Sequence, residues 1–464
     1  MLGIDDKNRK WWVLASVSGV LGLIVLDETV LGVALPTIRD DLGMSAYAVH
    51  WVMNAYLLVF TGFVAAGGKL NDVVGLRNLF IAGIVLFGLG SLGSGAAQDG
   101  TSIIAARALQ GFGAAMVFPS SIAMISAVFP PEQRGVAFGL QTTVGATFIT
   151  LGPLIGGALT EFASWRWVFW INLPVIAAIL FFTLISWVEP AQMRRPRMDW
   201  FGLATLVAGL SMFVLAIMQG PEWGWSDPTT LALLAAGSTV LAIFVLTELK
   251  ISFPLIELDL FRNPTFTGSN LVVFTAEVNK IAVIIFGALY LQQALGMSPF
   301  DAGLALLASV APTLITSIMA GRLADRLGTR WPALAGVLVF AAGLLWIGLA
   351  APFDDYLLLL PALIIWGAGM PFLYVPTTRA IMNSVPPEKR GQAGGIRVTA
   401  QFLGGTIGMA LCGTLLAVTN DFQVVFLVPA TVTFAVLAIG WFTIEHPLPA
   451  AGQAHAAHGH PEHL

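Results

Sequence analysis

The sequence predicts an all-α integral membrane protein with about fourteen transmembrane helices in two repeated halves. Three observations predict this: the composition, a succession of long apolar runs, and a pair of motifs that occurs twice. Of the 464 residues, 57% are hydrophobic and only 10% are Asp, Glu, Lys or Arg. Soluble domains carry roughly 25% charged residues, so the composition excludes an ordinary soluble protein.

Apolar runs long enough to cross a bilayer follow one another along the chain, since a span needs about 20 helical residues. The first run follows Lys7, Arg9 and Lys10, as the core of a signal peptide would. That run is too long and lacks a small-residue cleavage site, so we expect a retained span. The predicted spans are residues 11–32, 47–67, 79–97, 101–126, 136–159, 166–187, 201–218, 229–247, 266–293, 302–320, 332–350, 357–378, 392–416 and 422–444.

The cations between the spans predict the orientation, because Lys and Arg favour cytoplasmic loops. With the N-terminus in the cytoplasm, only Arg39 and Arg166 fall on the outer side of the membrane. We therefore expect both termini in the cytoplasm. The net charge of −4 is too small to indicate a nucleic-acid partner. The cations on the predicted cytoplasmic side are Lys7, Arg9, Lys10, Lys69, Arg77, Arg134, Arg194, Arg195, Arg197, Lys250, Arg262, Arg322, Arg326, Arg330, Lys389 and Arg390.

Two pairs of matching segments indicate an internal repeat. GKLNDVVGLR (68–77) matches GRLADRLGTR (321–330), and FPPEQRG (129–135) matches VPPEKRG (385–391). The offsets, 253 and 256 residues, nearly agree, and both pairs lie on the predicted cytoplasmic side, so the halves share one orientation. Two spans near 201–218 and 229–247 are extra. We expect an N-terminal six-helix bundle (1–189), a linker with two additional helices (190–263), a C-terminal six-helix bundle (264–446) and a disordered, His-containing tail (447–464).

Seven ionisable residues lie inside the predicted spans. A charge at the bilayer centre costs roughly 2.5–3.5 kcal/mol on insertion scales, so such residues face a cavity or a partner. Asp27 and Glu28 are neighbours on a helix and point about 100° apart, so they cannot face one route equally. The seven are Asp27, Glu28, Arg107, Glu277, Lys280, Arg379 and Arg397.

The chain resembles the major facilitator superfamily and, within it, the fourteen-span drug:proton antiporters. The resemblance implies two six-helix bundles in a parallel pseudo-twofold repeat, with two extra central helices. It also implies a monomer in the inner membrane of a bacterium that exports amphipathic organic compounds, such as drugs or lipophilic cations, in exchange for protons. Proton-coupled uptake of an organic solute and a non-transporting ligand sensor stay open. The matching stretches are LDETVLGVALP (26–36), RALQGFGAA (107–115), WRWVFWINLP (165–174), EWGWSDP (222–228), PLIELDLFRN (254–263) and YLQQALGMSPFDAGLALL (290–307).

By this resemblance, proton coupling falls to Asp27 and Arg107, with Glu277 as a second acidic candidate. An arginine stays protonated in proteins, so Arg107 would act on a neighbouring carboxylate instead of carrying the proton. A carboxylate balanced between burial and a nearby cation can bind a proton and release it. The alternative is a purely structural ion pair between Arg107 and Asp27.

The predicted substrate contacts are polar side chains within the spans. Glu277 and Lys280 are three residues apart on one helix face and can pair, either to line a site or merely to ease insertion. Arg379 and Arg397 would bind an anionic group or neutralise Glu277. The full set of candidates is Glu28, Asn54, Tyr56, Lys280, Tyr290, Gln292, Arg379 and Arg397.

Two motifs predict the gating elements. The first is the loop motif, which is the repeated segment at 68–77 and 321–330. The resemblance implies that this motif closes the cytoplasmic side by joining the two halves, although its residues could simply anchor the orientation. In the segment 145–157, small residues four apart let helices approach closely, and a proline permits a kink. The loop-motif candidates are Gly68, Asp72, Gly75, Arg77, Asp325 and Arg326; the candidates in 145–157 are Gly152, Pro153, Gly156 and Gly157.

The sequence indicates neither a cofactor nor an enzyme. GLGSLG (88–93) has the spacing of a dinucleotide loop but lies inside a span with no strand before it. No Gly-Lys-Ser/Thr phosphate loop is present, so ATP is not the expected energy source. No nucleophile–base pair or metal-ligand cluster stands out, and the single Cys412 cannot form an intramolecular disulfide.

Overall fold

The structure is a computed structural model that describes residues 8–188, 198–251, 253–297 and 299–444. Within these residues, fourteen helices are long and apolar enough to cross a membrane, which confirms the predicted number of spans. Regular secondary structure in the described part of the chain is entirely helical. The predicted tail, 447–464, lies outside the described residues.

The first six spans form one bundle. They are α1 (Arg9–Asp41), α2 (Ala46–Val74), α3 (Leu76–Ala96), α4 (Gly100–Val128), α5 (Arg134–Phe162) and a pair of short helices, α6 (Trp167–Trp170) and α7 (Asn172–Ser186). The 3₁₀ turn η1 (Pro131–Gln133) leads into α5. Helices α1 and α5, α2 and α4, and α3 and α4 pack against one another.

The last six spans form the other bundle. They are α10 (Pro264–Ile281) with η3 (Ala282–Phe286) and α11 (Gly287–Gln293), then α12 (Pro299–Leu327), α13 (Arg330–Ala350), α14 (Tyr356–Asn383), α15 (Arg390–Thr419) and α16 (Phe422–Thr443). Short 3₁₀ turns are η2 (Leu258–Arg262), η4 (Ala351–Phe353) and η5 (Pro387–Lys389). The extra helices are α8 (Trp200–Trp223) and α9 (Pro228–Glu248); α8 contacts α2 and α15, one helix from each bundle.

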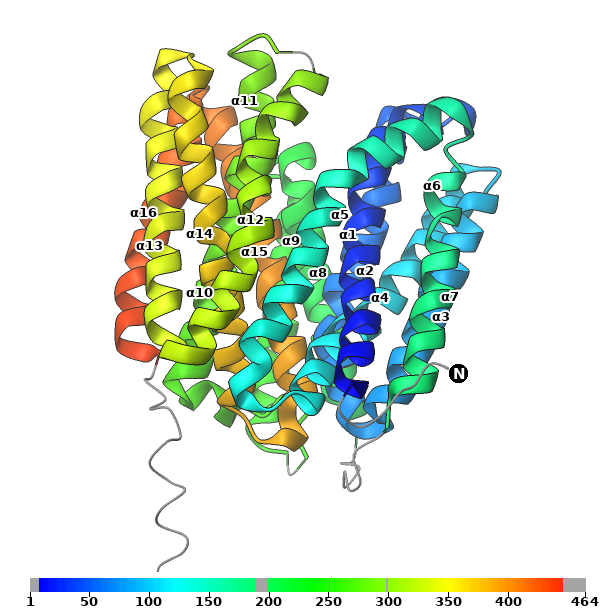
Figure 1. The fold of residues 1–464 in the computed structure, drawn as a ribbon. Coiled ribbons are helices and arrows are strands. Elements are labelled where there is room, and N and C mark those ends of the chain that lie inside the picture. The colour runs from blue at the N-terminus through cyan, green and yellow to red at the C-terminus, as the bar shows by residue number, and fades with distance from the viewer. Residues whose placement is uncertain (1–7, 189–197, 252, 298, 445–464) are drawn as a thin grey trace, which may run out of the picture.

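The two bundles meet at the end of the molecule that carries residues 68–77 and 321–330, here called the motif end. It is the lower end in Figure 1, where α1 begins and α16 ends. Glycines allow the backbones to touch there: a Cβ on Gly135 would lie 2.4 Å from the carbonyl oxygen of Gly321, and a Cβ on Gly68 would lie 2.7 Å from that of Gly391. Any larger residue would push the bundles apart at these points.

Two spans depart from regular α-helix beside polar residues. The sixth span breaks at Ile171, between α6 and α7, and α7 then begins with the fully buried Asn172. In the ninth span, the π-helical segment η3 begins two residues after Lys280. Such π segments occur frequently at functional sites.

The opposite end of the N-terminal bundle has its own polar tie. The Trp165 indole and the Arg166 guanidinium both donate to Asp41 Oδ2 at 2.9 Å. These two donors hold the pKa of the Asp41 carboxyl below its usual value of 3.8. The tie joins the end of α1 to the turn before α6.

Candidate functional site

A buried polar network surrounds Asp27 in the middle of α1. Arg107 Nη1 donates to Asp27 Oδ2 at 2.5 Å, and the other carboxylate oxygen accepts from Gln110 Nε2 at 2.7 Å and Asn172 Nδ2 at 2.9 Å. The Asp27 and Arg107 side chains are at most 1% exposed. A buried charge of each sign is thus paired and hydrogen-bonded, as the cost of burial requires.

The guanidinium of Arg107 has partners besides Asp27. Its Nε donates to the carbonyl of Val52 at 2.9 Å, and Nη1 also donates to Gln110 Oε1 at 2.7 Å. The Tyr56 ring lies against its face, 4.4 Å from Cζ to the ring centroid, a favourable cation–π geometry. Arg107 therefore keeps a polar cage even when Asp27 is neutral.

Three helices deliver this network to one point. Asp27 comes from α1, Arg107 and Gln110 lie three residues apart on one face of α4, and Asn172 is the first residue of α7. Asn172 Nδ2 also donates to Ser91 Oγ at 2.9 Å, which ties α3 to the same centre. Four helices of the N-terminal bundle thus meet at one carboxylate.

A second buried carboxylate, Glu277, occupies the first helix of the C-terminal bundle. Its Oε1 accepts from Tyr374 Oη at 2.8 Å and from Gln401 Nε2 at 2.7 Å, and its Oε2 pairs with Lys280. Arg397 joins through Gln401 Oε1, at 2.6 Å from Nη1. The expected pairing of Glu277 with Lys280 is present, and Arg397 reaches Glu277 through an amide.

Glu28 links the two networks electrostatically. The charges of Asp27 and Arg107 in its own bundle and of Lys280 and Glu277 in the other bundle all act on it. Its Oε1 is buried without a hydrogen-bond partner among the described residues, and so is the hydroxyl of Tyr56. Lys280 keeps 28% of its side chain exposed. Glu28 and Tyr56 of one bundle thus keep unused hydrogen-bonding capacity, and Lys280 of the other bundle remains partly accessible.

The remaining substrate candidates divide into two groups. Asn54 and Gln292 are half-buried and lie in α2 and α11. Tyr290 is engaged elsewhere: its hydroxyl donates to the carbonyl of Ala351 at 2.8 Å and lies 3.1 Å from Asp354 Oδ1. Arg379 does not neutralise Glu277. It pairs with Asp325 at 3.1 Å, because it lies four residues before the end of α14, at the motif end.

Glycines of the segment 145–157 pack α5 against α1 beside the Asp27 network. A Cβ on Gly152 would lie 1.9 Å from Thr29 Oγ1, and one on Gly156 would lie 2.7 Å from the carbonyl of Val30. A Cβ on Gly157 would meet nothing within 4 Å. Pro153 lies in α5, but its side chain is outside the described residues.

The loop-motif residues form two matching contacts between the bundles. Asp72, at the end of α2, lies against the first turn of α15, where a Cβ on Gly391 would lie 2.4 Å from Asp72 Oδ1. Asp325, at the end of α12, accepts from Gly135 and Val136 in the first turn of α5, each at 2.9 Å. Each carboxylate thus lies at the positive end of a helix dipole in the opposite bundle.

The two contacts follow the offsets of the sequence repeat. Asp72 and Asp325 are 253 residues apart (325 − 72), and Gly135 and Gly391 are 256 apart (391 − 135). Gly75 and Gly328, also 253 apart, both have positive φ, 97° and 80°, which favours glycine at the turn after the acid. Arg77 is half-buried in the first turn of α3, whereas Arg326 is exposed.

Sequence reasoning missed the uncharged members of both networks. Gln110, Asn172, Tyr374 and Gln401 are amides or a phenol, so they did not stand out as charges within spans. One signal could have found two of them: Gln110 and Gln401 follow Arg107 and Arg397 by three and four residues, on the same helix face. In the described part of the chain, no group of three or more His, Cys, Asp or Glu could hold a metal ion.

Comparison with known proteins gives consistent matches. The family model described as Major Facilitator Superfamily matches residues 17–269 and 269–461. The puromycin resistance protein of Streptomyces alboniger is 35% identical over 412 residues, which cover 88% of this chain and 82% of that protein. The tetracenomycin C resistance and export protein of Streptomyces glaucescens is 31% identical over 414 residues, covering 89% and 77%. The multidrug resistance protein Stp of Mycobacterium tuberculosis is 32% identical over 412 residues, covering 88% and 76%.

Solved structures match in fold. A major facilitator proton:xylose symporter superposes with a TM-score of 0.68 at 15% sequence identity, covering 95% of this chain and 97% of that chain. The Escherichia coli fucose:proton symporter gives 0.63 at 14% identity, covering 93% and 98%. At sequence identities this low, the matches are evidence for the fold alone. They confirm the predicted arrangement of two six-helix bundles.

Proposed function

Because this chain belongs to the major facilitator superfamily, a family of membrane transporters and not of enzymes, we propose that it exports amphipathic organic compounds in exchange for protons by alternating access. The names of the relatives support export as the direction: they include resistance proteins for puromycin and for multiple drugs, and an export protein for tetracenomycin C. Drugs and lipophilic cations are the substrates that we expect first.

The observation that carries proton coupling is the full burial of Asp27 against Arg107. Asp27 takes up a proton when the site is open to the outside and releases it when the site is open to the cytoplasm. Protonation neutralises the carboxylate, and Arg107 then relies on Val52 and Gln110, which already accept from it. Gln110 and Asn172 donate to the other oxygen of the carboxylate and hold it in place between α1, α4 and α7.

The proposed gate is the pair of acid-to-helix contacts at the motif end, which we place at the cytoplasmic face of a bacterial inner membrane. Asp72 and Asp325 hold the bundles together there while substrate leaves on the other side. Opening this end breaks both contacts, and rotation about the bundle interface exposes the site to the cytoplasm. An inward proton supplies roughly 2.3 kcal/mol per 100 mV of membrane potential, plus the pH term.

The proposed substrate site lies between the networks of Asp27 and Glu277. Glu28, Tyr56 and Lys280 supply the polar contacts, because Glu28 and Tyr56 have unsatisfied buried oxygens and Lys280 is partly exposed. Asn54, Gln292 and Arg397 complete the site. Asp27 exchanges the proton, Arg107 acts on the Asp27 carboxylate, and Glu277 is the second acidic candidate for proton coupling. The protein acts as a monomer.

Transport in inside-out membrane vesicles tests the direction and the coupling together. Vesicles that contain the protein, energised to an acidic interior, should accumulate a fluorescent lipophilic cation, and collapse of the pH gradient should release it. Loss of the cation on energisation would instead indicate uptake in the cell. Binding without any flux, in a purified and reconstituted sample, would indicate a ligand sensor.

A further inference from the structure

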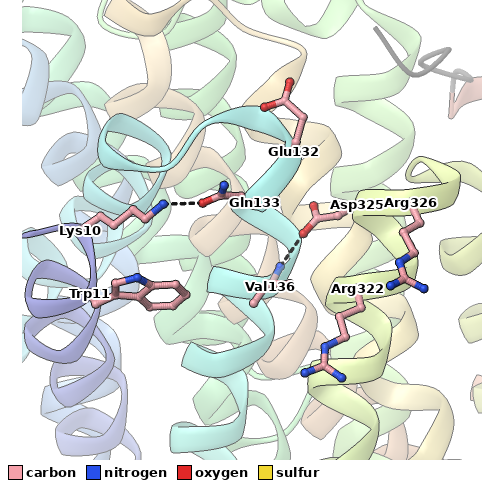
Figure 2. Close-up of a pocket in the computed structure, with 8 residues that line it drawn as sticks. All are labelled: Lys10, Trp11, Glu132, Gln133, Val136, Arg322, Asp325 and Arg326. Atoms are coloured by element: carbon pink, nitrogen blue, oxygen red, sulfur yellow. Dashed lines mark hydrogen bonds between the residues drawn. The ribbon is translucent and has the colours of Figure 1, made fainter. Parts of the chain in front are cut away.

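A groove at the motif end lies between the two bundles and is separate from the buried networks. It has a volume of about 510 Å³. It is lined by Lys10 and Trp11 of α1, by Glu132 and Gln133 of η1 and Val136 of α5, and by Arg322, Asp325 and Arg326 of α12. Figure 2 shows Lys10 and Trp11 on one side of the η1–α5 turn and the α12 residues on the other.

The groove carries an excess of positive charge that the protein leaves unneutralised. Arg322 and Arg326 are exposed, lie four residues apart on one face of α12, and have no hydrogen-bond or ion-pair partner among the described residues. Like charges at this spacing repel each other. On the other wall, Lys10 Nζ donates at 2.6 Å to the neutral amide oxygen of Gln133.

The acids of the groove do not balance these cations. The Asp325 carboxylate already has partners, since it accepts from two backbone N–H groups of α5 and pairs with Arg379, so it does not neutralise Arg322 or Arg326. Glu132 is a single exposed carboxylate opposite Lys10, Arg322 and Arg326. The groove therefore favours a compact anion that can contact α1 and α12 at the same time.

The rim of the groove is apolar. Trp11 is 44% exposed, and Leu323 and Leu327, on the same end of α12, are 37% and 53% exposed. Trp11 is the third residue of the first span, and α12 ends at Leu327. Tryptophan and exposed basic side chains at the ends of spans are typical of the membrane–water interface. From these residues we expect the groove to open at the depth where lipid headgroups meet acyl chains.

We propose that this groove is a binding site for an anionic phospholipid, with the headgroup phosphate between Lys10 and the Arg322–Arg326 pair. Basic pockets between transmembrane helices hold lipid phosphates in this manner. The acyl chains would lie along Trp11 and the exposed leucines. The bound lipid joins the two bundles where Gly135 touches Gly321, so it stabilises the state in which the motif end is closed.

The test uses the purified full-length chain in a neutral detergent. Phosphatidylglycerol, phosphatidylcholine and inorganic phosphate are titrated separately, with bound lipid counted by native mass spectrometry and the unfolding temperature recorded. The variant is Arg322→Gln/Arg326→Gln, with Lys10→Gln as a second, single-site variant on the other wall. The matched control is Lys250→Gln/Arg262→Gln, which removes two exposed cations outside the groove.

We expect the wild type to bind phosphatidylglycerol at least about tenfold more tightly than phosphatidylcholine, and the double variant to lose that preference. Lys10→Gln should weaken it, and the control should keep it. The proposal is wrong if the double variant binds phosphatidylglycerol as the wild type does. It is also wrong if inorganic phosphate raises the unfolding temperature as much as the lipid, because the groove would then be a site for free anions. Neither result bears on proton-coupled export.

Discussion

Arg107 Nη1 lies 2.5 Å from Asp27 Oδ2, and neither side chain is more than 1% exposed. Such a pair contributes little to net stability compared with an apolar pair of the same volume, but the loss of one partner leaves a buried, unpaired charge. The pair therefore makes the N-terminal bundle sensitive to the charge state of a single carboxyl group.

Arg107→Met should destabilise the protein by about 3–5 kcal/mol, because it removes one partner of a buried ion pair. The double variant Arg107→Met/Asp27→Asn should recover most of that loss, since it contains no buried charge at this pair. Thermal unfolding in detergent gives both comparisons. Equal destabilisation of the single and the double variant would mean that the network depends on the shape of Arg107 and not on its charge.

Gly152→Ala should impair transport, because its Cβ would lie 1.9 Å from Thr29 Oγ1, two residues after Asp27. The helix α5 must then shift away from α1, which displaces the carboxylate. Gly157→Ala is the matched control on the same helix, since its Cβ meets nothing within 4 Å. Substrate flux in vesicles should fall for the first variant and stay at the wild-type level for the second. Equal activity of both variants would argue that α1 tolerates the shift.

Asp325→Asn should favour opening of the motif end, because the charge that lies at the first turn of α5 and beside Arg379 is lost. Distances between spin labels placed on the two bundles at this end should gain a longer component. Asp355→Asn is the control: Asp355 caps α14 through Leu357 N, within one bundle and away from the motif end. An unchanged distance distribution for Asp325→Asn would remove this contact from the gate.

Glu28→Gln should weaken binding of a cationic substrate by about tenfold or more, since a hydrogen bond to a charged group is worth roughly 1.5–3 kcal/mol. A neutral analogue of the same shape should bind as before, because the glutamine side chain keeps the size and polarity of the site. Equilibrium binding to the purified variant measures both ligands. An equal loss for the charged and the neutral ligand would show that Glu28 supports the structure and does not select charge.

Much of the fold could be predicted from the sequence because the bilayer imposes a length and a composition on every span. The repeat could also be predicted, since GKLNDVVGLR and GRLADRLGTR share an aspartate and, three residues later, a glycine. Asp72 and Asp325 make equivalent contacts, and Gly75 and Gly328 make equivalent turns. Each copy of the motif contacts the first turn of a helix in the opposite bundle, so both copies need the same acid and the same glycine.

The candidate site was only partly predictable. A charged residue within a span must have a partner or a polar cavity, because burying a charge is costly, but the sequence does not say which residue the partner is. The family resemblance predicted that Arg107 acts on Asp27, and Arg107 lies against this carboxylate. Arg379 looked like the same kind of residue, yet α14 extends to Asn383 and carries it to the motif end. The hydrogen bonding of Tyr290 could not be predicted, because it depends on the turn η4, which brings the carbonyl of Ala351 within reach of the Tyr290 hydroxyl.

The most direct test of proton-coupled export is the movement of protons in liposomes that contain the purified protein and an internal pH-sensitive dye. A pH gradient is imposed, and a lipophilic cation is added to the wild type and to Asp27→Asn. We predict that the cation triggers a pH change with the wild type and none with the variant, while the variant still binds the cation. A substrate-triggered pH change that persists in Asp27→Asn would contradict the account, because the coupling proton would then travel by another group.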